Sequence, residues 1–171
     1  INIGIAGLGT VGSEVAKQLQ SNSEFLHRKA GKKLNLVAVS ANNKNKNRNF
    51  DLSNLKWFTN ATLMAETNEI DLVVELIGGS DGIALDLCKN SLIKGKSVVT
   101  ANKAMMSKHG YELAKISEKN KCSIAFEASV AGCIPIIKSL RDALSGTRVN
   151  SISGILNGTC NFILTEMREK G

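Results

Sequence analysis

The sequence opens with INIGIAGLGTVGSEVAKQL, residues 1–19, and this stretch decides the fold. Residues 1–6 form an apolar run, which predicts a buried strand. Residues 10–21 carry apolar side chains at helical spacing, which predicts a helix. The strand and the helix are joined by GLGTVG, residues 7–12, a GxGxxG motif. Strand, glycine turn and helix in this order are typical of the first βα unit of a dinucleotide-binding domain.

The three glycines of this motif have separate roles in that interpretation. Gly7 permits the tight turn, Gly9 lets a pyrophosphate approach the backbone, and Gly12 lets the helix pack on the strand. The helix N-terminus adds free N–H groups and a partial positive charge. The alternative is a plain glycine turn, because 15 glycines make chance matches easy. The flanking strand and helix favour the dinucleotide interpretation.

Strand and helix patterns alternate along the next hundred or so residues. Apolar runs predict strands at residues 34–39, 70–77, 97–100 and 123–127, with a short strand or turn at 55–58. Helical spacing predicts a brief helix at 62–67 and longer helices at 81–94 and 104–120. The alternation predicts an α/β fold, a doubly wound parallel sheet of the Rossmann type over residues 1–130.

The pattern changes after residue 127, where we place a domain border at 127–134. The single proline, Pro135, precedes a helical pattern at 136–144, an apolar run at 151–156 that predicts a strand, and a helix start at 162–170. We expect residues 131–171 to be the truncated start of an α+β substrate and dimerisation domain. The chain lacks an initiator Met and stops after a helical stretch, so we expect it to be a fragment.

Composition and charge exclude several classes of protein. The apolar share is 43%, with no apolar run near the ~18 residues of a membrane span and no visible signal peptide. The four cysteines form no CxxC pair, which favours buried, reduced thiols and a cytoplasmic protein: Cys88, Cys122, Cys133 and Cys160. Aromatic content is 4%, which argues against nucleic-acid binding.

The net charge of +7 comes from one acid-free segment, residues 26–49. Its basic residues are Arg28, Lys29, Lys32, Lys33, Lys44, Lys46 and Arg48. After the second strand, Ser40 and Asn42 can hydrogen-bond and Lys44 can supply charge, as can Lys46 and Arg48, and no acid appears before Asp51. Cations here favour NADP, since an acid would bind the ribose hydroxyls of NAD. The alternative is a solvated loop beside a polar NAD pocket.

Three later strand ends carry candidate functional residues. Glu75 is interpreted as a strand-end acid bound to neighbouring N–H groups, and Gly78 lets a planar ligand lie against the backbone. Lys103 follows residues 97–100, at the carboxyl edge where ligands gather, and can neutralise an anion or assist proton transfer. The alternative, a solvated lysine, is disfavoured by the helix dipole. Glu127 with the following glycine bend can form an oxygen cage for a hard cation, or an interdomain hinge.

Five motifs together resemble the homoserine dehydrogenase family, and its free-standing form more than the aspartokinase fusion. The motifs are GLGTVG (7–12), ELIGG (75–79), VVTANKA (98–104), FEASVAGCIPII (126–137) and GILNGTCNFIL (154–164). The resemblance implies reversible NAD- or NADP-dependent hydride transfer between L-homoserine and L-aspartate 4-semialdehyde, in threonine and methionine biosynthesis. Competing interpretations are another Rossmann enzyme such as aspartate dehydrogenase, or a non-catalytic nucleotide-binding module.

The resemblance also implies site residues. Thr10, Val11, Thr100 and Lys103 would contact the cofactor, and Lys103 would also take part in catalysis. A sodium or other monovalent cation would be held by Glu127 with the backbone of Val130, Gly132 and Ile134. The loop that opens the substrate region would be Asn157, Gly158 and Thr159. The family's substrate acids and general-acid lysine follow Gly171, so we expect this fragment to be inactive alone and the full-length protein to be a homodimer.

Overall fold

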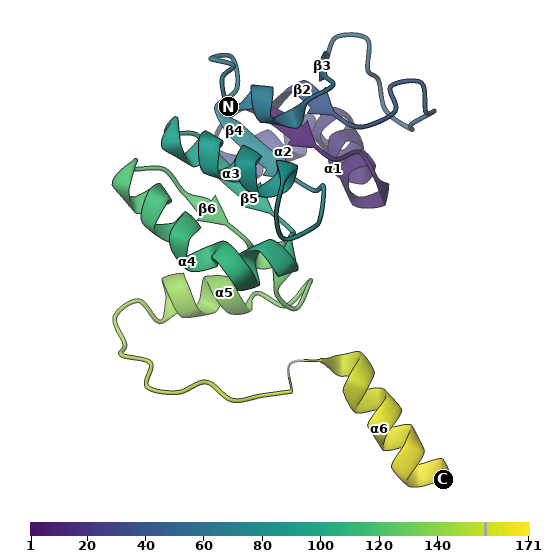
Figure 1. Cartoon of the computed structure of the whole chain (residues 1–171), viewed down its shortest axis with the longest axis vertical. Coiled ribbons are helices and arrows are strands. Elements are labelled where there is room, and N and C mark those ends of the chain that lie inside the picture. Colours follow the sequence, from purple (N-terminus) through teal and green to yellow (C-terminus); the bar gives the residue numbers. More distant parts are fainter. Residues whose placement is uncertain (156) are drawn as a thin grey trace.

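A computed structural model describes residues 1–155 and 157–171, and its described part is built on one six-stranded sheet (Figure 1). Every strand pair is parallel, and the strand order is β3-β2-β1-β4-β5-β6. The strands are β1 Asn2–Ala6, β2 Asn35–Ser40, β3 Lys56–Phe58, β4 Leu72–Glu75, β5 Ser97–Thr100 and β6 Ile124–Ala125. This order reverses between β1 and β4, which confirms the doubly wound Rossmann-type sheet.

Helices cover both faces of the sheet. The α-helices are α1 Thr10–Ser21, α2 Ser23–Ala30, α3 Ile83–Ile93, α4 Lys103–Lys119, α5 Ile136–Lys138 and α6 Gly158–Lys170. Short 3-10 turns lie at η1 Ala61–Met64 and η2 Glu127–Ser129, and a π-helical turn lies at η3 Ser139–Ala143. Among the described helices, none is long and apolar enough to cross a membrane.

The core divides according to the alternation of side chains along the strands. Val74 of β4 packs with Ala16 and Leu19 of α1 on one face. Its neighbour Val73 packs on the other face with Leu87 of α3. A third cluster joins β5 and β6 to α3 and α4 on that second face. The first helix and the later pair therefore sandwich the sheet.

Two elements differ from the sequence expectations. Helix α2 was not predicted: none of its residues is fully buried, its Leu26 is half-buried against the core, and it ends at Gly31 in the left-handed region (φ 68°). The predicted strand at residues 151–156 is wrong for residues 151–155, which are exposed and in no strand. A strand needs a hydrogen-bonding neighbour, and the described sheet offers none there. Leu156 lies outside the described residues.

Several boundaries also shift. Strand β4 ends at Glu75, two residues earlier than predicted, and β6 has only two residues. Helix α6 starts at Gly158 instead of residue 162. The cysteines are free, as expected, but burial holds only for Cys88, because Cys133 and Cys160 are exposed and Cys122 is half-buried. Burial raises the pKa of the Cys88 thiol.

Candidate functional site

The glycine turn after β1 is shaped by close backbone packing. Gly7 has φ +97°, and a Cβ there would lie 2.3 Å from the carbonyl oxygen of Leu76. A Cβ on Gly12 would lie 1.8 Å from the carbonyl oxygen of Gly7. Around Gly9, by contrast, a Cβ would meet nothing within 4 Å among the described residues. The turn is therefore tight on the protein side and open at Gly9.

Helix α1 points its N-terminus into that open space. Gly9 is its N-cap and supplies no side-chain cap, while the N–H of Ser13 bonds the Gly9 carbonyl at 2.9 Å. Thr10 and Val11, both exposed, form the first turn with Gly12. The first-turn N–H groups and the helix dipole suit an anion. The residues present thus fit a pyrophosphate, with room at Gly9 and donors in the first turn.

A cavity of about 340 Å³ adjoins the turn at the carboxyl ends of β1, β2 and β4. Gly7 and Gly9 line this cavity, and so does Ser40, which lies at the end of β2. Lys46 and Arg48 also line it, and the lining contains no Asp or Glu. Lys44, which was expected to supply positive charge here, is not among the lining residues. The basic residues at the cavity are Lys46 and Arg48.

Arg48 organises the basic loop beside this cavity. Its guanidinium donates to the carbonyl oxygen of Asn43 at 2.7 Å and of Lys46 at 3.0 Å. The same group lies over the ring of Trp57, 5.5 Å from its centroid. Arg48 is therefore half-buried and turned inward, whereas Arg28 and Lys29 belong to helix α2 and Lys33 follows it. The basic residues of segment 26–49 therefore lie in two separate groups, one at helix α2 and one beside the cavity.

Buried hydrogen bonds link the ends of β4 and β5. Glu75 accepts the N–H groups of Ile77 at 2.7 Å and Gly78 at 3.2 Å, as expected for a strand-end acid. Its second oxygen accepts the hydroxyl of Thr100 at 2.5 Å. Thr100 is fully buried, and its hydroxyl also accepts the N–H of Asn102 at 3.0 Å. With the hydroxyl engaged inside the protein, a contact of Thr100 with a cofactor stays a prediction.

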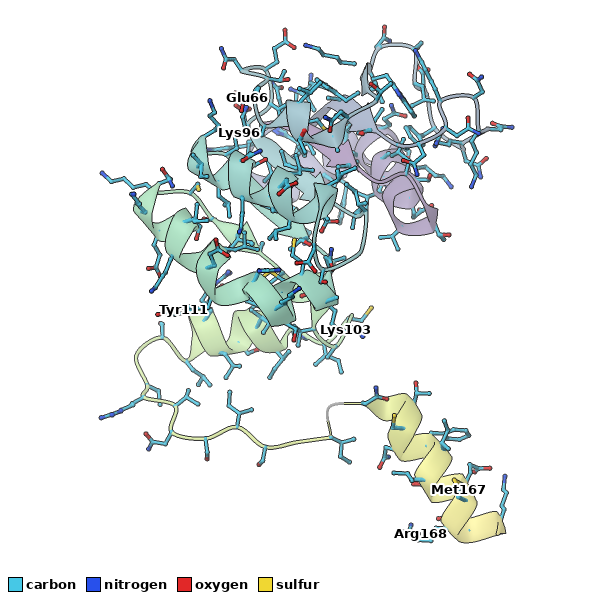
Figure 2. The ribbon with its side chains drawn as sticks, viewed as in Figure 1. Glu66, Lys96, Lys103, Tyr111, Met167 and Arg168 are labelled. Carbon is cyan, nitrogen blue, oxygen red and sulfur yellow. The ribbon has the colours of Figure 1, made fainter. Side chains whose placement is uncertain are left out.

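Lys103 begins helix α4 at this same edge. The preceding residue, Asn102, caps the helix by accepting the N–H of Met105 at 3.0 Å. Lys103 is exposed, and Figure 2 shows it at the opposite end of the domain from Glu66 and Lys96. A cation in a first helical turn is opposed by the helix dipole, which an anionic ligand would offset. The position agrees with the carboxyl edge expected for Lys103.

Asp81 is a residue of this region that the sequence analysis missed. Its carboxylate accepts hydrogen bonds from Lys108 at 2.8 Å and Ser80 at 2.6 Å, and contacts the ring Nε2 of His109 at 2.9 Å. These contacts hold the pKa of Asp81 well below its usual range, with the bond from Lys108 as the largest cause. Asp81 thus ties the loop after β4 to α4. A lone Asp beside glycines gave no signal of this pairing.

The candidate cation loop differs in detail from the expectation. Strand β6 ends at Ala125, so Glu127 lies in the 3-10 turn η2, not at the strand end. Its carboxylate accepts the N–H groups of Ile137 at 3.1 Å and Lys138 at 2.8 Å. No group of three or more His, Cys, Asp or Glu able to hold a metal occurs in the described residues. Any cation here would depend on one carboxylate and on main-chain oxygens.

The main-chain oxygens of that loop are in part available. The Ile134 carbonyl accepts the N–H of Ile136 at 2.8 Å, whereas those of Val130 and Gly132 accept no hydrogen bond from the described residues. Ala131 has φ +47° and Cys133 has φ +71°, both strained conformations for residues with a side chain. A non-glycine loop held in this way fits a hard cation or a hinge equally.

The predicted substrate residues form the start of α6. Asn157 is its N-cap and accepts the N–H of Cys160 at 2.9 Å, and Gly158 and Thr159 open the helix. All three are exposed. Figure 1 shows α6 apart from the sheet, so the described part of the chain does not bring these residues to the glycine turn.

Comparisons with known proteins cover almost the whole chain. Residues 7–127 match the family model described as "Homoserine dehydrogenase, NAD binding domain", and residues 135–171 match "Homoserine dehydrogenase". The homoserine dehydrogenase of Neisseria gonorrhoeae is 42% identical over 171 residues, which are 100% of this chain and 39% of that protein. That of Helicobacter pylori is 46% identical over 169 residues, 98% of this chain and 38% of its own length.

Solved structures give the same result for the fold. The crystal structure of a homoserine dehydrogenase from Thiobacillus denitrificans has a TM-score of 0.85 at 42% identity, over 99% of this chain and 39% of that one. A hyperthermophilic archaeal homoserine dehydrogenase in complex with NADPH has a TM-score of 0.80 at 28% identity, over 100% and 57%. The chain spans about two fifths of the length of the curated relatives given above.

Proposed function

We propose, because this chain belongs to the homoserine dehydrogenase family, that it is the nicotinamide-cofactor half of an enzyme that interconverts L-homoserine and L-aspartate 4-semialdehyde. The observation that carries the proposal is the uncapped N-terminus of α1 facing the open space at Gly9, inside a chain that matches both family models. The bound cofactor would supply the hydride acceptor and donor. The reaction would serve threonine and methionine biosynthesis.

In this proposal the residues of the chain bind and orient the cofactor. Gly7, Gly9 and Gly12, with the first-turn N–H groups at Thr10 and Val11, would hold the pyrophosphate. Gly78 and the Lys103 ammonium would lie at the edge where the reacting ring is placed. Lys103 would neutralise negative charge or assist proton transfer, and a second lysine, the general acid, would come from the part of the enzyme that follows Gly171.

The cofactor in this proposal is NADP, although NAD uses the same pyrophosphate site. Ser40, Lys46 and Arg48 line the cavity beyond β2, and its lining holds no carboxylate to bind ribose hydroxyls. The archaeal relative whose structure contains NADPH belongs to the same family. A 2′-phosphate would meet Lys46 and the inward-turned charge of Arg48.

Further parts of the proposal concern the cation, the substrate and the assembly. A sodium or similar ion would be bound by Glu127 and the carbonyl groups of Val130, Gly132 and Ile134, with the Ile134 carbonyl shared with an N–H group. Asn157, Gly158 and Thr159 would form the loop that opens the substrate region. The division into residues 1–130 and 131–171, a cytoplasmic location and a homodimer of the full-length protein are also part of the proposal.

The test uses the full-length enzyme and compares the two cofactors. We expect homoserine oxidation with NADP, and a kcat/KM at least about tenfold lower with NAD. Lys46→Ala should raise the KM for NADP about tenfold and leave that for NAD unchanged, because only the 2′-phosphate contact is lost. Lys44→Ala is the matched control and should change neither KM. A clear NAD preference, or an equal effect of both variants, would refute the NADP assignment.

A further inference from the structure

We infer that Glu75, Thr100 and Asn102 are positioning residues: they hold the loop after β4 and the start of α4 in the arrangement that receives the nicotinamide half of the cofactor. The inference rests on the proposed function for the identity of that ligand. It assigns to the three side chains a supporting role instead of direct contact with the cofactor.

The strand register brings the first two residues together. Glu75 and Thr100 are direct partners on the last rung of the β4–β5 pair. Both are fully buried. Glu75 forms no ion pair with any described Lys or Arg, and its hydrogen bonds come from neutral donors: the N–H groups of Ile77 and Gly78 and the Thr100 hydroxyl. Burying a carboxyl group costs free energy. Its place at the end of β4 therefore points to a positioning role.

The network continues from Thr100 into the next loop. The Thr100 hydroxyl accepts the Asn102 N–H, and the Asn102 amide donates to the carbonyl oxygen of Gly79 at 2.6 Å. Its amide oxygen caps α4 through the N–H of Met105. The loop after β4 is therefore tied twice, once by the carboxylate of Glu75 and once by the amide of Asn102, and the start of α4 is tied to the same loop.

The loop benefits from such ties because its two glycines give the unfolded chain much conformational freedom. Gly78 and Gly79 are exposed and have φ of +85° and +82°, and a Cβ on Gly78 would meet nothing within 4 Å among the described residues. Glycine loses more conformational freedom than other residues when it is ordered. Fixing the loop before the ligand arrives reduces the ordering penalty on binding. In a doubly wound sheet a dinucleotide spans the point where the strand order reverses, between β1 and β4. The carboxyl ends of β4 and β5 therefore face the half of the dinucleotide that does not contain adenosine.

The experiment separates the two halves of the cofactor, using the full-length enzyme. Thr100→Val removes the hydroxyl but keeps the shape, Thr100→Ser keeps the hydroxyl, and Asn102→Asp keeps the helix cap but loses the donor to Gly79. Calorimetry would measure the Kd of NADPH, and of adenosine 2′,5′-bisphosphate, which has no nicotinamide. Steady-state kinetics would give kcat and KM for each variant.

We expect Thr100→Val and Asn102→Asp to weaken NADPH binding about tenfold and to lower kcat by at least as much, with the Kd of the bisphosphate within twofold of wild type. Thr100→Ser should restore both values. The two deleterious changes should be less than additive when combined, because they break one network. Leu92→Ala, a buried core change remote from the network, should lower thermal stability with kcat retained.

Three results would overturn the inference. They are wild-type NADPH binding in both deleterious variants, equal weakening of the two ligands, or a Thr100→Ser enzyme as impaired as Thr100→Val. If wild-type enzyme fails to oxidise homoserine, the proposed function fails, but the comparison of the two ligands needs no turnover and still tests the positioning role. If Thr100→Val does not fold, Asn102→Asp supplies the same test.

Discussion

The glycines of the turn differ in whether a side chain would fit at their position. At Gly12, a Cβ would lie 1.8 Å from the carbonyl oxygen of Gly7, so the contact between the helix and the turn requires glycine at this position. At Gly9, the space is open and the backbone dihedrals (φ −74°, ψ −160°) suit any residue. Gly12 is therefore required by packing, whereas Gly9 has no role in packing and is explained by a ligand.

Alanine substitutions should separate these two requirements. Gly12→Ala forces α1 away from β1 and should lower the free energy of unfolding by about 1–3 kcal/mol or more. Gly9→Ala should change it by no more than about 0.5 kcal/mol, but weaken dinucleotide binding at least about tenfold because the methyl group occupies the pyrophosphate space. Urea denaturation and calorimetric titration measure the two effects. Equal destabilisation by both variants would contradict this account.

Among the elements, α4 is the one that holds the site edge together. Its first turn carries Lys103, its cap residue is Asn102, and its second turn reaches back through Lys108 and His109 to Asp81. The Asp81 contacts are exposed to solvent, so their contribution to stability is small and sensitive to salt. Their use is to keep the loop after β4 against the helix.

The Asp81 contact predicts a stability difference that depends on pH. Because the folded-state pKa of Asp81 is lowered, its contribution is full above the usual carboxyl pKa of about 4 and is lost as pH falls toward the folded value. Asp81→Asn should therefore lower the thermal midpoint by about 2 °C at most at pH 7, and by progressively less below pH 4.

Thermal melts at pH 7 and pH 3 would measure this difference. High salt at pH 7 should shrink the difference, and Lys108→Gln should reproduce most of it. A wild-type advantage that is undiminished at pH 3 would show that Asp81 acts by packing instead of by charge.

On the scale of the whole molecule, the core belongs to the first three quarters of the chain. Among the described residues, the three buried clusters are formed between Ile3 and Ile124. Beyond Ser145 every described residue is exposed except Thr165 and Glu166, which are half-buried. Helix α6 exposes Phe162 and Leu164, which is the pattern of a helix that awaits packing partners.

The position of the core predicts the result of shortening the chain. A chain ending after Ser145 should melt within about 2 °C of the 171-residue chain, because none of the described residues after Ser145 is a buried apolar one. It should bind a dinucleotide with the same affinity as the longer chain, since the glycine turn, the basic loop and Lys103 all remain. Circular dichroism and calorimetry check both statements. A large fall in the melting temperature would place part of the core in residues 146–171.

The amino-acid sequence alone determined the family, the doubly wound sheet and the glycine turn, because these depend on local patterns: an apolar run, glycines at fixed spacing, and alternating periodicity. It also indicated that Glu75 binds nearby N–H groups, a contact two residues away. Helix α2 and the absence of a strand at 151–155 were not predictable, since α2 has no fully buried residue and a strand depends on a neighbouring strand.

Only the tertiary structure decided which distant side chains meet. Glu75 and Thr100 share a rung because β4 pairs with β5 in one register, although 25 residues separate them in the chain. Arg48 turns inward because Trp57 and the loop carbonyls surround it, whereas Lys46 lines the cavity and Lys44 is not among its lining residues. Such contacts are set by strand register and loop closure, which bring together groups that no local pattern in the chain connects.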